Sequence, residues 1–233
     1  MSKITYLITV YNEIKTVKKA IQDVIEIKYN NKEIIIIDNA STDGSQLIIK
    51  NFQSKNIKVK KILRKENLGF GKSINEGIKK AKGDYIYIQY SDLEYDHNRS
   101  IYMMNYAKKN NLDAVLGSRL KNKKKSIIKF IISKPSYLAT AITTFLINIF
   151  YGKKFTDIIG GKLYKRESIN NIKSMSFHEG YDFELISRMC KQKLKIGEVS
   201  IKYSPRKNSN EKKIKFYHMF NALYQIFKVK FFN

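Results

Sequence analysis

Apolar and polar residues along the first half of the chain follow two alternating periodicities. Residues 3–10 are largely apolar and β-branched, as in a strand, whereas apolar residues recur at helical spacing over residues 13–27. Asn12 precedes this helical stretch and is expected to cap it. Residues 33–37 then form a continuous apolar run, which is typical of a strand covered on both faces of a parallel sheet. The chain is therefore predicted to begin with a strand, a helix and a second strand.

The same alternation continues to residue 116. The further predicted elements are a helix from residue 45, a strand over 57–63, a helix over 71–81, a strand over 85–88, a helix over 98–110 and a strand over 113–116. Strands joined by helical crossovers lie parallel in one sheet. The predicted fold class is therefore α/β, with a doubly wound, mostly parallel sheet of the Rossmann type. Ligands of such sheets bind at the carboxyl ends of the strands.

The second half of the chain is less regular. Its predicted elements are a helix over 135–151, a helix over 182–191, a strand over 194–201 and a basic helix over 213–232. No linker rich in Pro, Gly or Ser and no internal repeat separates the two halves. We therefore expect one domain over residues 1–233, in which residues 3–116 form one half of the site. Residues 117–233 form the other half as a C-terminal helical elaboration.

The formal net charge of +25 would ordinarily indicate an anionic partner. Lysine supplies nearly all of it, and we attribute this to a compositional bias of the genome. Arginine, the residue that nucleic-acid readers favour, is scarce, so no nucleic-acid partner is expected. The single cysteine, Cys190, excludes an internal disulfide and fits a reducing compartment. The N-terminus lacks the features of a signal peptide, and a cytoplasmic location is expected.

The segment over residues 135–151 carries no formal charge and is flanked by lysines. It is shorter than the ~20 apolar residues that a spanning helix needs. We expect it to lie in the membrane interface, so that the protein is peripheral to the inner face of the membrane. Burial in the core or in a homo-oligomer interface is an equally ordinary explanation.

Polar residues follow three of the predicted strands, in the stretches TVYNE at 9–13, DNASTDGS at 38–45 and SDLEYD at 91–96. Carboxylate and amide oxygens can accept hydrogen bonds from a nucleotide base or a ribose. The stretch at 38–45 is equally explained as a turn from strand to helix. The crowded carboxylates at 91–96 repel one another unless a cation lies among them.

Together with ENLGFGKSINEGIKKAKGDYI at 66–86, these stretches resemble the family-2 glycosyltransferases, which have a nucleotide-diphospho-sugar transferase (GT-A) fold. VLGSRL at 115–120, TDIIGGKLYKRE at 156–167 and EGYDFELISRM at 179–189 resemble the dolichol-phosphate or polyprenyl-phosphate sugar transferase branch. The seven motifs occur in order and span residues 3 to about 230.

The resemblance implies a nucleotide-sugar donor, GDP-mannose or UDP-glucose, and a divalent metal, Mg²⁺ or Mn²⁺. The residues expected to bind the donor are Thr9, Tyr11, Glu13, Asp38, Asn39, Ser91 and Asp92. Asp92 and Glu94 are expected to hold the metal, which neutralises the charge that grows on the departing diphosphate. Tyr90 stands where the family usually has an aspartate, so metal binding is expected to be weak and to depend on Glu94.

The resemblance also implies an acceptor site in the second half of the chain. The residues expected to form it are Arg119, Lys129, Ser133, Lys134, Asp157 and Asp182. Arg119 and Asp92 are the predicted catalytic residues. A lipid phosphate is mostly ionised near neutral pH and needs cations rather than a strong base. Gly160 and Gly161 replace the bulkier residues that the family often has here and are expected to loosen the loop.

The predicted function is inverting transfer of mannose or glucose from the nucleotide-sugar to polyprenyl or dolichol phosphate. One alternative is transfer to a saccharide hydroxyl in surface-polysaccharide synthesis, which requires a general base, either Asp182 or Glu179. A second alternative is a catalytically silent scaffold, which the loss of the aspartate at Tyr90 motivates.

Overall fold

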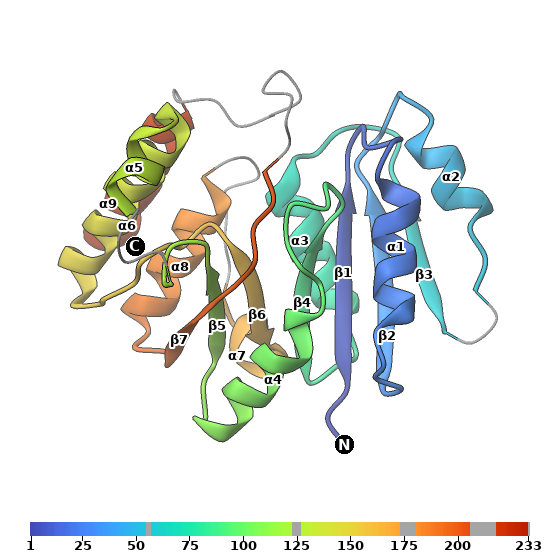
Figure 1. Ribbon diagram of the computed structural model, residues 1–233, viewed down its shortest axis with the longest axis horizontal. Coiled ribbons are helices and arrows are strands. Elements are labelled where there is room, and N and C mark those ends of the chain that lie inside the picture. Colours follow the sequence, from blue (N-terminus) through green and yellow to red (C-terminus); the bar gives the residue numbers. More distant parts are fainter. Residues whose placement is uncertain (55–56, 123–126, 173–179, 206–217, 233) are drawn as a thin grey trace.

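The computed structural model describes residues 1–54, 57–122, 127–172, 180–205 and 218–232 (Figure 1). Helices and strands alternate as far as residue 118, as the sequence predicts. The elements are β1 (Ile4–Val10), α1 (Val17–Glu26), β2 (Lys32–Asp38), α2 (Ser45–Asn51), β3 (Val59–Leu63), α3 (Phe70–Lys80), β4 (Tyr85–Tyr90), α4 (Arg99–Lys109), β5 (Ala114–Ser118), α5 (Ile127–Ile132), α6 (Pro135–Tyr151), β6 (Gly161–Lys165), α7 (Arg166–Asn170), α8 (Tyr181–Lys191), β7 (Ile196–Ser200) and α9 (His218–Phe231).

The described strands form one seven-stranded sheet in the order β3-β2-β1-β4-β6-β5-β7. β3, β2, β1 and β4 are parallel neighbours, and β5 and β7 are also parallel to each other. β6 lies antiparallel between β4 and β5 and joins the two halves of the sheet. The sequence does not predict β6, because Lys162 places a charge inside a short and largely buried strand. The sheet is therefore mixed and mostly parallel.

Neighbouring residues of each central strand point to opposite faces of the sheet, and each face carries its own apolar core. On one face, Tyr6 and Ile8 of β1 pack with residues of α1, α2 and α4. On the other face, Leu7 packs with residues of α3, α7 and α8 (Figure 1). The run over residues 33–37 supplies apolar side chains to both cores, as expected for a strand covered on both faces.

The loop between β1 and α1 differs from the prediction. α1 begins at Val17, four residues later than expected, and Asn12 does not cap it. Asn12 adopts a φ of 52°, and its side-chain oxygen accepts a hydrogen bond from the backbone N–H of Thr42 at 2.8 Å. Its own backbone N–H donates to Ser41 Oγ at 2.9 Å. Asn12 therefore fastens the loop after β1 to the loop after β2, which brings two predicted donor-binding stretches together.

Gly160, directly before β6, allows a close backbone contact, which corrects the expectation that Gly160 and Gly161 loosen this loop. Gly160 is buried against β5, and a Cβ atom at this position would lie 1.8 Å from the carbonyl oxygen of Gly117. No side chain fits such an approach. Glycine is therefore required here by the close contact of two backbones.

α6, α8 and α9 form a helical layer beside the β5–β7 end of the sheet (Figure 1). α6 has the bounds that the sequence predicts for an uncharged helix. α9 begins at His218 in the described part of the chain, and the predicted start near residue 213 lies outside it. Within the described residues, none of the helices combines the length and the apolar character needed to cross a bilayer.

Candidate functional site

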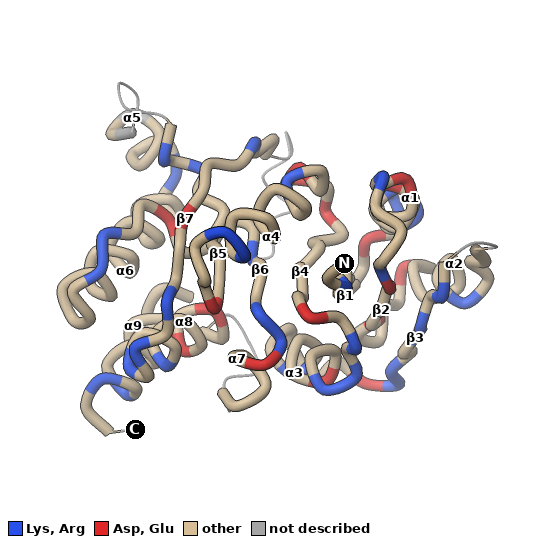
Figure 2. The backbone as a smooth tube through the Cα atoms, turned by 90° about the horizontal axis from the view of Figure 1, so that it is seen from below, with Lys and Arg blue, Asp and Glu red and all other residues tan. Residues whose placement is uncertain are grey.

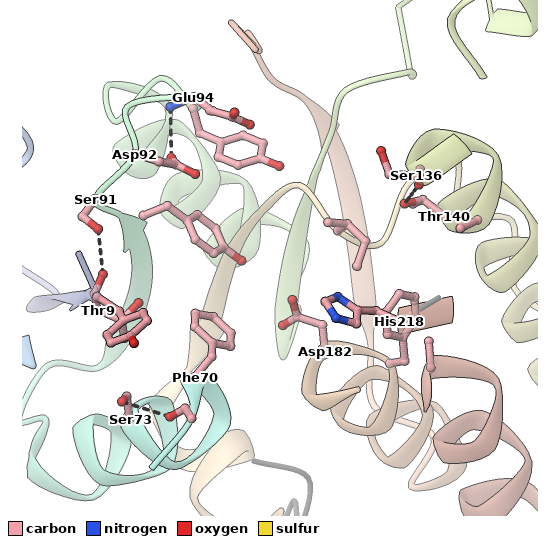
Figure 3. Close-up of a pocket in the computed structure, with 18 of the residues that line it drawn as sticks. Thr9, Phe70, Ser73, Ser91, Asp92, Glu94, Ser136, Thr140, Asp182 and His218 are labelled. Carbon is pink, nitrogen blue, oxygen red and sulfur yellow. Dashed lines mark hydrogen bonds between the residues drawn. The ribbon is translucent and has the colours of Figure 1, made fainter. Parts of the chain in front are cut away.

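A pocket of about 470 Å³ opens at the carboxyl ends of the parallel strands, between the two halves of the chain (Figure 3). This volume is usual for a small-molecule site. The predicted site residues that line it are Thr9, Tyr11, Glu13, Asn39, Ser91, Asp92, Glu94, Arg119 and Asp182. Residues predicted for the donor, the metal and the acceptor thus face one cavity, because the parallel strands end at the same edge of the sheet.

The donor side of the pocket is built from the ends of β1 and β4. Ser91 Oγ donates to the backbone carbonyl oxygen of Thr9 at 2.9 Å, which ties the two strand ends together (Figure 3). Glu13 is held in the following loop, because its backbone N–H donates to Ser45 Oγ at 2.8 Å. Its carboxylate accepts from the Thr16 hydroxyl at 3.1 Å. This wall is therefore fixed before any ligand arrives.

Asn39 lines the pocket, but its side-chain amide is engaged within the protein. Its Oδ1 accepts from Arg64 Nη1 and from the backbone N–H of Leu68, both at 3.0 Å. Its Nδ2 donates to Asn67 Oδ1. The predicted contact between Asn39 and a nucleotide base stays a prediction, and its amide oxygen already has two donors.

Asp38 is fully buried and is not among the residues that line the pocket. Its Oδ2 accepts from the backbone N–H of Ser41 at 3.0 Å and from Gln46 Nε2 at 2.7 Å. Its Oδ1 is buried and has no hydrogen-bond partner in the described part of the chain. Leaving a buried acceptor without a donor costs about 1–3 kcal/mol. The donor-binding role of Asp38 stays a prediction.

Asp92 and Glu94 both line the pocket next to the end of β4. Asp92 Oδ1 accepts from the backbone N–H of Glu94 at 3.1 Å, and Leu93 between them has a φ of 60° (Figure 3). Left-handed backbone is uncommon at a bulky residue and persists where the surrounding structure enforces it. No group of three or more His, Cys, Asp or Glu close enough to hold a metal occurs among the described residues. Asp92 and Glu94 both line the pocket, as Glu13 does, and their role as metal ligands stays a prediction.

Tyr90 is bonded to a buried lysine at the floor of the pocket. Lys162 Nζ donates to the phenolic oxygen of Tyr90 at 2.8 Å and to Asp182 Oδ2 at 3.0 Å. It also donates to the carbonyl oxygens of Ile159 and Gly160 at 3.1 and 3.2 Å. Lys162 is only 1% exposed, and a buried charge is costly unless it is paired. Here Asp182 forms an ion pair with the ammonium group, and further oxygen atoms accept its hydrogen bonds.

Burial raises the pKa of Tyr90 well above its ordinary value, and the negative charge of Asp182 adds to this effect. The phenol therefore stays protonated at neutral pH and brings no charge to a metal. Tyr90 instead serves as an oxygen partner of the buried Lys162 ammonium.

Arg119 is held by a bidentate ion pair with Asp157. Its Nε lies 2.6 Å from Oδ2 and its Nη2 lies 2.9 Å from Oδ1 of Asp157. The Tyr203 and Tyr137 rings lie 5.3 and 5.7 Å from the centre of the guanidinium. Arg119 lines the pocket, yet it is 7% exposed and Asp157 is fully buried. The pair neutralises the arginine at the base of the acceptor side.

Ser133, Lys134 and Asp157, which are also predicted for the acceptor, are not among the residues that line the pocket. The Ser133 hydroxyl donates to the backbone carbonyl oxygen of Phe130 at 2.7 Å. Lys134 precedes α6, and its Nζ lies 6.0 Å from the centre of the Tyr137 ring. The side chain of Lys129 and the whole of Glu179 lie outside the described residues. The roles of all these residues stay predictions.

Four further residues line the pocket although no sequence motif predicts them there: Tyr95, Tyr137, Tyr203 and His218. The Tyr95 and Tyr203 rings lie 5.3 Å apart, and a β-bridge joins their backbones. His218 projects from the start of α9 near Asp182 (Figure 3). Tyr95 lies within the SDLEYD stretch and could have been recognised there. Tyr203 and His218 lie in irregular or weakly patterned segments that carry no comparable signal.

A mixed seven-stranded sheet with a pocket at its carboxyl edge is the architecture expected of the GT-A class of nucleotide-sugar transferase folds. Two solved structures have the same fold. Glucosyl-3-phosphoglycerate synthase from Mycobacterium tuberculosis, in complex with Mn²⁺ and UDP, superposes with a TM-score of 0.71 at 14% identity, covering 98% of this chain and 80% of the other. The mannosyltransferase PcManGT from Pyrobaculum calidifontis, in complex with GDP-Man and Mn²⁺, superposes with a TM-score of 0.66 at 12% identity. This match covers 98% of this chain and 70% of the mannosyltransferase. The predicted fold is therefore confirmed.

The chain belongs to glycosyl transferase family 2, whose family profile matches residues 5–173. The prediction of a glycosyltransferase is thereby confirmed at the level of the family. Poly-beta-1,6-N-acetyl-D-glucosamine synthase from Staphylococcus epidermidis is 31% identical over 218 residues, which are 87% of this chain and 48% of the relative. The Staphylococcus aureus synthase of the same name is 35% identical over 122 residues, 52% of this chain and 29% of the relative.

The chain thus spans about half the length, or less, of these curated relatives. Their names describe synthases of a saccharide polymer. These relatives do not support the prediction that the chain belongs to the polyprenyl-phosphate branch of the family.

Proposed function

We propose that the chain transfers a sugar from a nucleoside diphosphate to a hydroxyl group of a saccharide acceptor. The observation that carries this proposal is that Asp92 and Glu94 face the same pocket as Asp182, from opposite halves of the chain. The relatives that make poly-N-acetylglucosamine support a saccharide acceptor. They also make UDP-N-acetylglucosamine the first donor to test, before the GDP-mannose and UDP-glucose predicted from the sequence.

The donor side fits a nucleotide-sugar with a divalent metal. Mg²⁺ and Mn²⁺ prefer oxygen ligands and are commonly held by one or two carboxylates together with substrate phosphates. Asp92 and Glu94 are such a pair and would hold the metal here. When bound, the ion would neutralise the negative charge that develops on the departing diphosphate. Tyr11 and Thr9 would lie against the nucleoside.

The acceptor side fits a hydroxyl group, because it offers a carboxylate as general base. In the proposed step the acceptor oxygen forms a bond with the anomeric carbon, and the bond from that carbon to the phosphate oxygen breaks. The hydroxyl proton passes to Asp182, and the configuration inverts. Lys162 holds Asp182 Oδ2 at 3.0 Å and so orients the carboxylate at the edge of the pocket (Figure 3).

The pairing of Arg119 favours a hydroxyl acceptor over a phosphate acceptor. A phosphate needs cations, and Arg is best suited to bind it through two parallel hydrogen bonds. Here Nε and Nη2 of Arg119 are already committed to Asp157. Release of the guanidinium for a phosphate would leave Asp157 charged and fully buried, at a cost of several kcal/mol.

The direct test uses radiolabelled nucleotide-sugars with Mn²⁺ or Mg²⁺ and two acceptors, β-1,6-linked N-acetylglucosamine oligosaccharides and polyprenyl phosphate. We expect label in the oligosaccharide. Label only in the lipid would contradict the proposal and restore the prediction made from the sequence. If the protein transferred no sugar and bound no nucleotide-sugar in calorimetry, it would be a silent scaffold.

Replacing Asp182 by Asn is expected to lower kcat for a hydroxyl acceptor by about 10²–10⁴-fold, because the amide cannot take the proton. Donor affinity, measured by calorimetry, should stay within about twofold. Glu26→Gln, which removes an exposed carboxylate at the end of α1, is the matched control and should leave kcat unchanged. A variant Asp182→Asn with normal kcat would rule out Asp182 as the base.

A further inference from the structure

α6 and α9 each expose a stripe of large apolar side chains. The exposed positions of α6 are Leu138, Ile142, Phe145 and Ile149, and those of α9 are Phe220, Tyr224, Phe227 and Phe231. Both sets follow the spacing i, i+4, i+7, i+11, which places each set on one face of its helix. Phe145 and Phe231 are 62% and 61% exposed. In a helix that faces water, these positions are ordinarily polar.

The two stripes belong to one surface. The Phe150 ring of α6 lies 5.3 Å from the Phe227 ring and 5.8 Å from the Phe231 ring of α9. Ile128 and Ile132 of α5, which packs beside α6, are also strongly exposed. We call this surface, formed by the exposed apolar residues of α5, α6 and α9, the apolar face. Large exposed apolar patches on soluble domains generally mark an interaction site.

The segments that carry α5, α6 and α9 contain basic residues but no acidic ones. The sequence contains no Asp or Glu over residues 119–156 or over residues 212–233. Lys153 and Lys154 follow α6, and Lys228 and Lys230 lie on α9 (Figure 2). Lys230 Nζ donates to the carbonyl oxygen of Phe150 at 2.7 Å, and Lys228 Nζ lies 5.6 Å from the centre of the Tyr224 ring. Lys228 Nζ therefore lies beside an aromatic ring of the apolar face, whereas Lys230 Nζ is bonded to the last turn of α6.

We propose that the apolar face docks on an anionic bilayer surface, with α6 and α9 lying in the interface. Apolar and aromatic side chains would enter the boundary of the acyl chains, and the lysines would meet lipid phosphates. The absence of acids from both segments favours this occupant over a protein partner, since protein interfaces deplete lysine. The proposal extends the predicted interfacial helix at 135–151 to a surface of several helices, and it does not depend on the proposed function.

The inner faces of the same two helices wall the pocket. Tyr137, Thr140 and Thr143 of α6 line it, as do His218 and Ala222 of α9. A bilayer on the apolar face would therefore lie one helix diameter, about 10 Å, from the acceptor side of the pocket. The acceptor class that suits this placement is a glycan held at the membrane surface.

The test is co-sedimentation of the full chain with phosphatidylcholine vesicles, with and without phosphatidylglycerol. We expect binding that requires the anionic lipid and weakens with salt. The double variant Phe145→Glu/Phe227→Glu should bind the anionic vesicles more weakly than the wild type. We expect a loss of at least about tenfold in affinity for each phenylalanine that is replaced. Leu47→Glu is the matched control, because Leu47 is 62% exposed on α2, at the opposite end of the sheet, and its substitution should change nothing.

Three outcomes would overturn the proposal. The first is that the wild type does not bind anionic vesicles. The second is equal binding by the wild type and the double variant while both keep the same melting temperature. The third is a wild-type dimer in light scattering that Phe145→Glu converts to a monomer, because the apolar face would then bind a second copy. Vesicle binding needs no substrate, so it is measured whether or not the transferase assay succeeds.

Discussion

Replacing Asp92 by Asn is expected to abolish sugar transfer, with kcat/KM falling by about 10³-fold or more. The carboxylate faces the pocket beside Glu94 and belongs to the pair that would hold the metal. An amide has the same shape as a carboxylate but lacks the negative charge that binds a divalent cation. Without the cation, the charge that develops on the diphosphate is not neutralised. The measurements are steady-state kinetics with Mn²⁺ and calorimetric titration of Mn²⁺ with the nucleotide present.

Asp96→Asn is the matched control for this experiment. Asp96 belongs to the same acidic stretch but does not line the pocket, and its Oδ1 accepts from the backbone N–H of Asn98 at 2.9 Å. Its substitution should change kcat/KM by less than about threefold, because only a local turn contact is affected. Full metal-dependent activity in Asp92→Asn would show that the donor site has been assigned to the wrong carboxylate.

Replacing Asp157 by Ala is expected to lower the free energy of unfolding by about 3–5 kcal/mol, because it leaves the Arg119 charge buried and unpaired. Urea denaturation measures this change. The double variant Asp157→Ala/Arg119→Met should recover part of the loss, since it removes the orphaned charge as well. As a control, Glu167→Ala breaks an exposed pair with Lys165 and should cost less than about 1 kcal/mol. If Asp157→Ala were as mild as Glu167→Ala, the buried pair would contribute little.

The same ion pair makes stability depend on pH. Burial alone would raise the pKa of Asp157, but the Arg119 charge and the hydrogen bonds from Arg119 and Ile159 lower it below its ordinary value. A carboxyl whose pKa is lower in the folded state stabilises the protein above its unfolded pKa of about 3.9, and this contribution is lost as pH falls through the folded pKa. We therefore expect the wild type to lose stability below about pH 4 more steeply than Asp157→Ala. Parallel slopes in urea titrations at pH 3–6 would contradict this.

The sequence predicts the donor side of the pocket better than the acceptor side, for a physical reason. Parallel strands end at one edge of the sheet, so the backbone alone brings the residues that follow β1 and β4 together. No particular side-chain contact is needed for this. α6 could be predicted with its bounds because Pro135 begins it, Gly152 ends it and no charge interrupts it. The later start of α1 does not follow from local pattern, because Asn12 bonds to Thr42 in a loop that is distant in sequence.

Contacts between distant residues decide the acceptor side. The sequence marks both Arg119 and Asp157 but gives no sign that each would neutralise the other. β6 is hidden because Lys162 interrupts its apolar pattern, and so its pairing with Asp182 and Tyr90 is hidden as well. Such pairs follow from the order of strands in the sheet, which local patterns do not encode.

Lys162 bonds to Tyr90 at the end of β4 and to Asp182 at the start of α8, and so links the donor half of the pocket to the acceptor half. Asp92 lies two residues beyond Tyr90, so one ammonium group connects the strand end that leads to Asp92 with the helix that carries Asp182. A substitution that displaces Lys162 is therefore expected to disturb both walls of the pocket. New specificity in related chains should therefore arise more readily at Tyr137 and Tyr203, which also line the pocket, than at Lys162.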